Sequence, residues 1–589
     1  MSTADLVNHL KAIYASYRHT ADIDAKGIFF SPSCYQICRP NPSFAAHNRE
    51  TIVRYLHEYA PKDENGASGS SGKPAKKGYY TIRPLEKEEF EFGADEQTAP
   101  AGFSSASEVE QKARREGTYV GMDVGESIMG FRASLTFTIG VLTLTCRAQN
   151  PIPEDQDPCL DPGVLASKWF DDNMIRPNYV PATTEEKPIV AQRIFDQPQT
   201  SETGKSYVTS LEQTSVLYMT GVIVDLLQAD VQKTGAPEDL PRSLGTGYNS
   251  AILVGERSTL RFSGRIETHN GAINLYATGA GTTVTLEAPQ LYSSGPGAIG
   301  LFAIRGANLD VTNLRHCSGG YRSPTLAGLN INSRGGVAHT TNPGSPLIYS
   351  LGRTMSSNLT GWADASPAII MEGPQYVHLN GSTITSGTIS GFLFFDWSIT
   401  AQHDAGTLEA MSLNLTVREG PAFYLATFSA EIILMNARIY NPSGILLLAD
   451  TNTASRDLER VEPQLWSGSP ISSNSSLTLM GSEGISGDIV TRGGCTVTVN
   501  LLANSTWQGS ANASLINNRG GLTVQIDDTS TWIVAKNSFV RGLSVVGGDL
   551  GRLKDQGYTV AYDQKAAESS WLQGRTYTLQ SGGKLQPWN

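Results

Sequence analysis

A short pattern that repeats about three times between residues 249 and 320 constrains the fold more than any other feature. Each copy pairs a short apolar run with an alternating run, and then closes on Gly, Ser or Asn. The copies are residues 249–270, 271–295 and 296–320. A repeat of roughly 20 to 30 residues built from strands and tight turns is typical of a solenoid, in which each repeat forms one coil. We therefore predict an all-β right-handed parallel β-helix.

Equivalent apolar positions align between the three copies, which predicts that their side chains stack inward from coil to coil. Each coil then buries its inward row only against its neighbours, and both ends of the stack need a cap. The aligned sets are Ala251, Leu253, Leu260 and Phe262, then Ala272, Leu275, Val284 and Leu286, and then Ala298, Leu301, Leu309 and Val311. A β-sandwich of short strands is the alternative fold for this pattern. Residues 333–364 read as a longer insertion between coils.

Length and composition fit such a chain. With 589 residues the chain is too long for one compact core, whereas a solenoid grows without that limit. The 59 glycines and the charged fraction of 17% suit many tight turns and stacked uncharged rows. A formal net charge of -11 argues against nucleic acid or an anionic membrane as the partner.

The first residues of the chain read as a helix and lack the basic, apolar and small-residue regions of a secretory signal. We therefore expect a cytoplasmic protein. The cysteines, which lack metal-site spacing, are then expected to be reduced structural thiols. They are Cys34, Cys38, Cys146, Cys159, Cys317 and Cys495. Asn-x-Ser/Thr motifs read as outward-facing turn residues in such a protein and not as glycosylation sites. Examples are Asn358, Asn414, Asn474, Asn504 and Asn512.

Changes in pattern along the chain predict three regions. Residues 1–150 alternate helical stripes with strands and contain a Gly-, Ser- and Lys-rich flexible insertion at 61–78. Residues 151–211 are rich in proline and are expected to form an extended connector. Residues 212–589 are expected to form the β-helix.

The order of elements in residues 1–150 is helix, helix, strand, helix and then several antiparallel strands. This order resembles the α+β barrel superfamily of nuclear transport factor two, scytalone dehydratase and the SnoaL-like polyketide cyclases. The resemblance implies a pocket in a curved sheet closed by the first helices. Barrels of this kind catalyse cofactor-free acid/base chemistry on small molecules, or only bind and dimerise, so a homo-oligomer through this domain is also expected.

Polar groups in such a pocket are the candidate site residues, because burial in an apolar cavity moves the pKa of a carboxylate or a histidine toward neutrality. In this barrel the candidate catalytic residues are Asp22, His47 and Asp123, and the candidate substrate-binding residues are Tyr14, Tyr17 and Tyr80. A second candidate pocket lies in a loop that leaves a strand of the β-helix, with His403 as the catalytic candidate and Asp396 and Trp397 as the binding candidates. Tyr17 matches the first catalytic tyrosine of the scytalone dehydratases, but Arg18 follows it where that family has Asp.

Residues 215–587 carry phrases such as PAFYLATFSAEIILMNARI and TVTVNLLANSTWQGS. These phrases resemble the β-helix repeats of adhesin-like and autotransporter passenger proteins and of related fungal proteins. The Asp pairs of pectin hydrolases and the acidic calcium ligands of pectate lyases are absent from the sequence, so glycoside cleavage has no support. Aromatic side chains that are candidates for stacking on a sugar are Trp362, Trp397, Trp466 and Trp507.

Two functions follow from these patterns. The first is a cofactor-independent, metal-free tailoring enzyme of secondary-metabolite biosynthesis, which would catalyse cyclisation, isomerisation (a pericyclic ring closure included) or dehydration of a small apolar polyketide or terpenoid. Redox and metal motifs such as a dinucleotide fingerprint, HExxH or CxxC are absent from the sequence. The alternative is a non-enzymatic, adhesin-like β-helix that recognises carbohydrate.

Overall fold

The computed structural model describes residues 189–237, 240–395, 405–426, 428–450, 473–511 and 521–588, together with short pieces of residues 51–160. The chain divides into two compact units, Met1–Gln149 and Asn150–Asn589. In the first unit, β1 (Tyr79–Pro84), β2 (Met122–Ile128) and β3 (Phe131–Leu135) form an antiparallel sheet. Most of the α+β barrel predicted for residues 1–150 lies outside the described residues.

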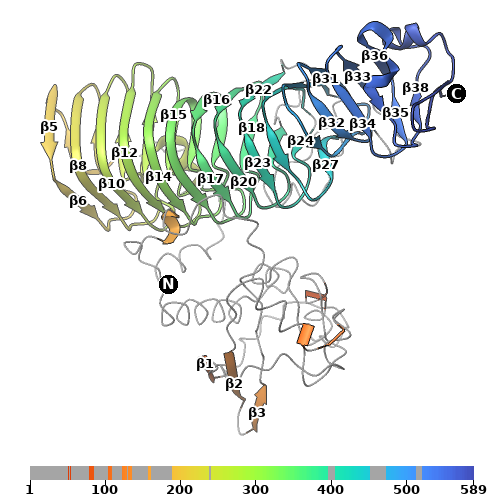
Figure 1. Cartoon of the computed structure of the whole chain (residues 1–589). Helices are drawn as coiled ribbons and strands as arrows, with labels where there is room; N and C mark the ends of the chain where they lie inside the picture. Colours follow the sequence, from red (N-terminus) through yellow and green to blue (C-terminus); the bar gives the residue numbers. More distant parts are fainter. Residues whose placement is uncertain are drawn as a thin grey trace. The chain divides into compact units, whose positions relative to one another are not determined.

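The second unit is a parallel β-solenoid of about 15 turns that begins at residue 191 (Figure 1). This confirms the solenoid predicted for the carboxy-terminal part. A β-sandwich is excluded for the described strands of this unit, because every pairing among them is parallel except that of β39 with β40. Residues 333–364 are not an insertion, since they form parts of β15, β16 and β17 in successive coils.

Each coil contributes to three rows of parallel strands. The first row consists of β4 (Ala191–Phe195), β7 (Ser215–Met219), β9 (Ile252–Val254), β11 (Leu275–Thr278), β13 (Leu301–Ile304), the first residues of β15 (Leu326–Thr340) and β16 (Ile348–Ser357), β18 (Ile369–Glu372), β21 (Phe392–Phe395), β24 (Phe423–Ala426), β27 (Ile445–Asp450) and β30 (Asp488–Thr491).

The second row runs beside the first. It consists of β5 (Gln199–Thr203), the first halves of β8 (Ile223–Lys233), β10 (Thr259–Thr268), β12 (Thr283–Ser293) and β14 (Asn308–Ser318), the middle of β15, the end of β16, β19 (Tyr376–Asn380), β22 (Gly406–Met411), β25 (Ala430–Met435), β28 (Asn474–Met480), β31 (Thr496–Leu502), β33 (Gly521–Ile526) and β36 (Gly542–Val545).

The third row closes the coil. It consists of β6 (Ser206–Thr209), the second halves of β8, β10, β12 and β14, the end of β15, β17 (Thr360–Ala363), β20 (Thr383–Ser386), β23 (Asn414–Val417) and β26 (Arg438–Tyr440). A separate parallel sheet contains β29 (Ile485–Ser486), β32 (Thr506–Gly509), β34 (Thr531–Val534) and β37 (Leu553–Lys554).

The last coils end in a small sheet of β35 (Ser538–Val540), β38 (Val560–Tyr562), β39 (Tyr577–Thr578) and β40 (Lys584–Pro587). Short helices accompany the strands. They are η6 (Pro158–Leu160), α7 (Leu240–Thr246), η7 (Val546–Gly548), η8 (Leu550–Arg552) and η9 (Ala567–Leu572).

The solenoid begins inside the region predicted to be a connector. β4 pairs in parallel with β7, and β5 and β6 pair in parallel with β8. Parallel pairing therefore starts at Ala191 and not at residue 212. Alternate residues of β5 and β6 are exposed, as expected of strands at the end of a stack. These strands therefore lack the apolar runs from which the later coils were predicted.

The predicted inward stacking is confirmed in most positions. Leu260, Val284 and Leu309 lie opposite one another on β10, β12 and β14, and all three are buried. Leu253 differs, because it lies opposite Tyr276, whereas its neighbour Ile252 lies opposite Leu275. The predicted register of the first row is thus wrong between the first two copies, whereas the predicted alignment of Leu275 with Leu301 is confirmed.

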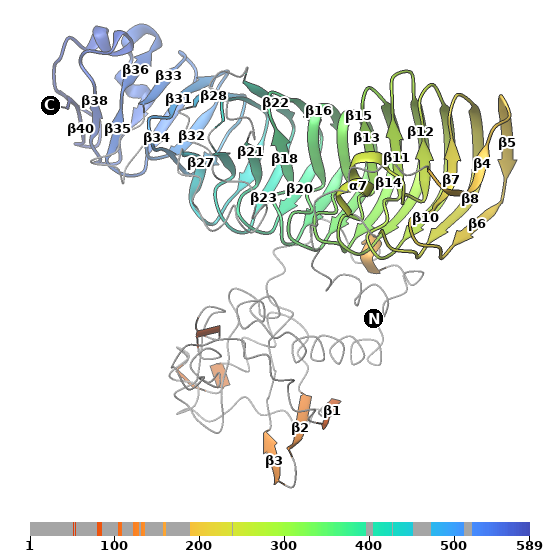
Figure 2. The ribbon, with the colours of Figure 1, turned by 180° about the vertical axis from the view of Figure 1, so that it is seen from behind.

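The outer face of the first row explains this shift. Leu253 and Tyr276 belong to a second apolar cluster on that face, against which Leu244 of α7 packs. Figure 2 shows α7 lying over the strands of the first row. Because α7 covers these strands from outside, apolar residues occur on both of their faces and alternation no longer reveals which side is inward.

A single left-handed residue marks the bend between the second and third rows in many coils. Ala288 (φ 46°), Asn313 (φ 51°) and Asn358 (φ 53°) occupy this position. Asparagine tolerates this conformation, whereas an alanine there is strained by about 1 kcal/mol or more.

Ala288→Gly should therefore raise the stability of the protein, by up to about 1 kcal/mol, because glycine has no Cβ penalty at positive φ. Urea unfolding measures the change. Ala280→Gly is the matched control, since Ala280 is also exposed but is not at positive φ, and it should lose roughly 0.5 kcal/mol. Equal destabilisation by both changes would contradict the strain assigned to Ala288.

Candidate functional site

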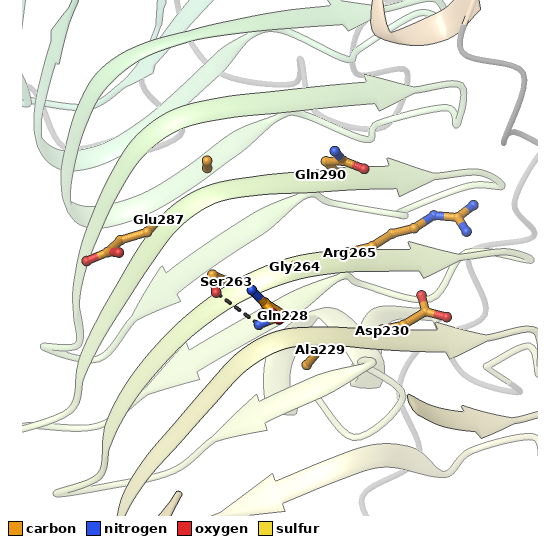
Figure 3. Close-up of a pocket in the computed structure, with 9 residues that line it drawn as sticks. Gln228, Ala229, Asp230, Ser263, Gly264, Arg265, Glu287 and Gln290 are labelled. Carbon is orange, nitrogen blue, oxygen red and sulfur yellow. Dashed lines mark hydrogen bonds between the residues drawn. The ribbon is translucent and has the colours of Figure 1, made fainter. Parts of the chain in front are cut away.

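An open pocket lies on the outside of the solenoid, where the second and third rows meet on three successive coils (Figure 3). Its volume is about 460 Å³. It is lined by residues of β8, β10 and β12 and of the bends within them. The lining residues are Gln228, Ala229, Asp230, Ser263, Gly264, Arg265, Glu287, Ala288 and Gln290.

The strand register places the polar groups of this pocket in rows. Asp230, Arg265 and Gln290 lie opposite one another on the three strands. Neighbouring strands in a sheet are about 4.8 Å apart, so these side chains form a ladder across the pocket. The second carboxyl oxygen of Asp230 accepts from Gln232 at 2.8 Å, while the first has no hydrogen-bond partner among the described residues.

Arg265 is held at the edge of the pocket by its neighbours. Its guanidinium donates to Glu267 at 2.5 Å and lies 5.2 Å from the ring centroid of Tyr292. Burial alone would raise the pKa of Glu267, but the hydrogen bond from His269 and the charge of Arg265 outweigh it and lower that pKa. Glu267 therefore neutralises Arg265, and the carboxylates of Asp230 and Glu287 give the pocket its negative charge.

A second cluster is centred on His339 of β15. Its Nδ1 lies 3.0 Å from a carboxyl oxygen of Asp157, and its Nε2 lies 3.0 Å from one of Asp364. Burial would lower the pKa of His339, but the two carboxylates raise it to about 10. The imidazole is therefore protonated at neutral pH and donates from both nitrogens.

An aromatic stack covers this histidine. The ring of Trp362 lies parallel to the imidazole with the centroids 4.7 Å apart, and the guanidinium of Arg418 lies 4.3 Å from the Trp362 centroid. Trp362 is only 9% exposed, and Trp507 is fully buried against Trp532. Neither tryptophan can serve as the exposed sugar-stacking platform that was predicted, whereas Trp397 and Trp466 lie outside the described residues.

A disulfide between Cys159 and Cys317 fastens η6 to β14 beside this cluster, with the two Cα atoms 5.0 Å apart. The prediction that these cysteines are reduced thiols is therefore wrong. Asp157, Cys159 and His339 lie close enough together to hold a metal ion. The sulfur of Cys159 is engaged in the disulfide, so it is no thiolate ligand in this form of the protein.

Most of the predicted site residues are outside the part that the structure describes. This holds for the catalytic candidates Asp22, His47 and His403 and for the binding candidates Tyr14, Tyr17, Asp396 and Trp397. Asp123 lies on β2 opposite Arg83, and Tyr80 lies on β1 opposite Glu126, so these two candidates share one sheet. Within the described residues, no helix is long and apolar enough to cross a membrane.

The sequence analysis predicted neither the pocket on β8, β10 and β12 nor the cluster around His339, although the sequence contains one signal of the second. Tyr292, Cys317, His339 and Trp362 occupy the same position on four successive coils. Aligning these coils would have shown a cysteine, a histidine and a tryptophan side by side. Asp157 could not have been added, because it lies 182 residues before His339.

The charged histidine makes stability depend on pH. Because the pKa of His339 is raised above its unfolded value of about 6.5, its stabilising effect is complete below that pH and is lost as the pH rises through about 10. His339→Gln should therefore lower the melting temperature strongly at pH 6 and much less at pH 10. His378→Gln is the control, since His378 pairs with Glu409 at a partly exposed site. A loss that is equal at both pH values would contradict the ion-paired histidine.

The comparisons with known proteins give one match, which lies within the first unit. Residues 1–126 match the family model described as SnoaL-like domain, as the order of elements predicted. No curated protein and no solved structure matches the chain. The chain thus consists of a SnoaL-like domain followed by a parallel β-solenoid.

Proposed function

We propose that the β-solenoid is a carbohydrate-binding module and that the pocket on β8, β10 and β12 is its binding site. The observation that supports this most is the ladder of hydrogen-bonding side chains in an open pocket. Ladders of this kind suit a ligand with many hydroxyl groups, because each hydroxyl both donates and accepts. An apolar polyketide could not hydrogen-bond to these side chains, so covering them would cost binding energy.

The size and shape of the pocket agree with a short stretch of a glycan. A volume of about 460 Å³ falls in the range of ligand sites. The ladder has one hydrogen-bonding side chain on each of three successive strands, so successive sugar units of a linear chain would each meet one such side chain. Glu287 and Gln290 are exposed on β12 and can meet a ligand, while the buried oxygen of Asp230 without a hydrogen-bond partner among the described residues lies at the same pocket.

The charge of the pocket narrows the kind of glycan. Asp230 and Glu287 contribute two carboxylates, whereas the charge of Arg265 is neutralised by Glu267. A polyanion such as a uronic acid polymer would be repelled at this site. The proposed ligand is therefore a neutral glycan or one that carries amino sugars.

Glu287→Gln should weaken glycan binding roughly 10-fold, because a hydrogen bond to a charged group contributes about 1.5 kcal/mol or more. Isothermal titration with neutral, amino-sugar and uronic acid oligosaccharides measures the affinity. Glu483→Gln is the matched control, since Glu483 is exposed on a distant coil. The proposed site would be contradicted if the protein bound none of the three kinds of oligosaccharide, or if Glu287→Gln left the affinity unchanged.

The family match supports a second function for residues 1–126. A SnoaL-like domain fits a cofactor-independent enzyme that cyclises, isomerises or dehydrates a small apolar substrate of secondary metabolism. Asp22, His47 and Asp123 are its proposed acid and base groups, and Tyr14, Tyr17 and Tyr80 its proposed substrate contacts. The solenoid would then be an accessory module.

Metabolite profiling with and without the gene tests this second function. If a precursor accumulates and the purified full chain converts it without added cofactor, Asp22→Asn and Asp123→Asn should each lower the turnover rate at least 100-fold. Glu431→Gln, on an exposed position of β25, is the control that should leave turnover unchanged. An unaltered metabolite profile would contradict the enzyme.

A further inference from the structure

We propose that Asp157, Cys159, Cys317 and His339 form a redox-controlled zinc site, which binds the ion only after the disulfide between the two cysteines has been reduced. All four residues belong to the second compact unit. The site is separate from the pocket on β8, β10 and β12, and the inference does not depend on either function proposed above.

The four side chains offer the donor atoms that zinc prefers. Two thiolates, an imidazole nitrogen and a carboxylate oxygen match the four-coordinate tetrahedral geometry of structural zinc sites. One donor atom from each of Asp157, Cys159 and His339 lies within 4.8 Å of the other two. Donor atoms around one zinc ion are roughly 3 to 4 Å apart, because the bonds from zinc to N, O and S are about 2.0 to 2.3 Å long. Small shifts therefore bring these three atoms around an ion.

The strand register supplies the fourth donor. Cys317 of β14 lies opposite His339 of β15, so the two side chains leave neighbouring strands on the same face of the sheet. The sulfur of Cys317 is bonded to that of Cys159, which lies 3.7 Å from the carbonyl oxygen of His339. Reduction would thus leave two thiols beside the imidazole and the carboxylate of Asp157, with no change in the strands.

The two nitrogens of His339 are arranged as in a zinc-bound histidine. Nδ1 faces Asp157 within the cluster, while Nε2 lies 3.0 Å from a carboxyl oxygen of Asp364. A histidine that binds a metal through one ring nitrogen usually donates its other N–H to a carboxylate or carbonyl, which fixes the tautomer and strengthens the ligand. Asp364 lies 3.8 Å from the guanidinium of Arg418, which offsets part of its charge. Nε2 is therefore held by Asp364, and Nδ1 is the atom that faces the ion.

The cluster is sheltered from water on most sides. Asp157, Cys317 and His339 are all more than nine-tenths buried, and the ring of Trp362 stacks on the imidazole. Surroundings of this kind limit the access of solvent to a bound metal. Cys159 is partly exposed, so its sulfur is the one that a reductant reaches first.

The switch takes place in two steps. First, a thiolate of a dithiol reductant attacks the sulfur of Cys159, and Cys317 leaves. The second thiol of the reductant then releases Cys159, so two electrons and two protons pass to the cysteines and the reductant becomes a disulfide. In the second step, Zn²⁺ displaces the protons of both thiols and the proton on Nδ1 of His339. A disulfide oxidant takes the two electrons back from the cysteines and releases the ion.

Zinc binding by the purified full chain in its two redox states tests the proposal. One sample is reduced with dithiothreitol, which is then removed by gel filtration without oxygen, and the other sample is left oxidised. After Zn²⁺ has been added and the excess removed, elemental analysis should find about one more zinc ion per chain in the reduced sample. Zinc should also protect Cys159 and Cys317 of the reduced chain from iodoacetamide, which peptide mass spectrometry measures.

Variants of the reduced chain assign the ligands. Asp364→Ala should weaken zinc binding roughly 10-fold by removing the partner of His339, while the thiolate-to-metal absorption of the Co²⁺-loaded protein is retained. Cys317→Ser should weaken binding by at least about 100-fold and reduce that absorption, because it removes a ligand and not the partner of one. Cys495→Ala is the matched control, since Cys495 is a buried free cysteine outside the cluster, and it should leave the affinity unchanged.

The unaltered chain decides the outcome even where a variant fails to fold. Equal zinc content in the oxidised and reduced samples would overturn the proposal. Alkylation of Cys159 and Cys317 at the same rate with and without zinc would overturn it as well.

Discussion

The stacking of each coil on the next is the interaction on which the rest of the structure depends. Inward residues such as Leu260, Val284 and Leu309 meet only across the gap between coils, so no coil has a core of its own. Toward the carboxy terminus the same role passes to the stacked rings of Trp507 and Trp532, whose centroids are 5.0 Å apart. Because this burial fixes the register, it also fixes which side chains face outward.

Outward positions therefore come in rows, and the chemistry of this protein lies in those rows. Glu267, Tyr292, Cys317, His339 and Trp362 occupy one outward position of the third row on five successive coils. None of them belongs to the main core cluster, so each coil can carry a different group there. One stretch of the row borders the pocket on β8, β10 and β12. The next stretch is joined to η6 by the disulfide and to Asp157, just before η6, by an ion pair.

The sequence predicts well what depends on neighbours along the chain or on the repeat. The solenoid and most inward positions are predicted correctly because apolar residues recur at fixed spacing, but Leu253 is not, since α7 covers the outer face of its strand. The disulfide and the pairing of Asp157 with His339 are not predictable in this way, because they join residues 158 and 182 positions apart. For the SnoaL-like domain the order of elements was enough to predict the family match.

The central claim is that the inward rows, stacked from coil to coil, hold the solenoid together. Urea unfolding of Val284→Ala tests this most directly, because Val284 is fully buried between Leu260 and Leu309. Stacking predicts a loss of roughly 2 kcal/mol in the free energy of unfolding, whereas Thr285→Ala, at the next and partly exposed position of the same strand, should lose less than about 0.5 kcal/mol. Equal losses from the two changes would contradict it.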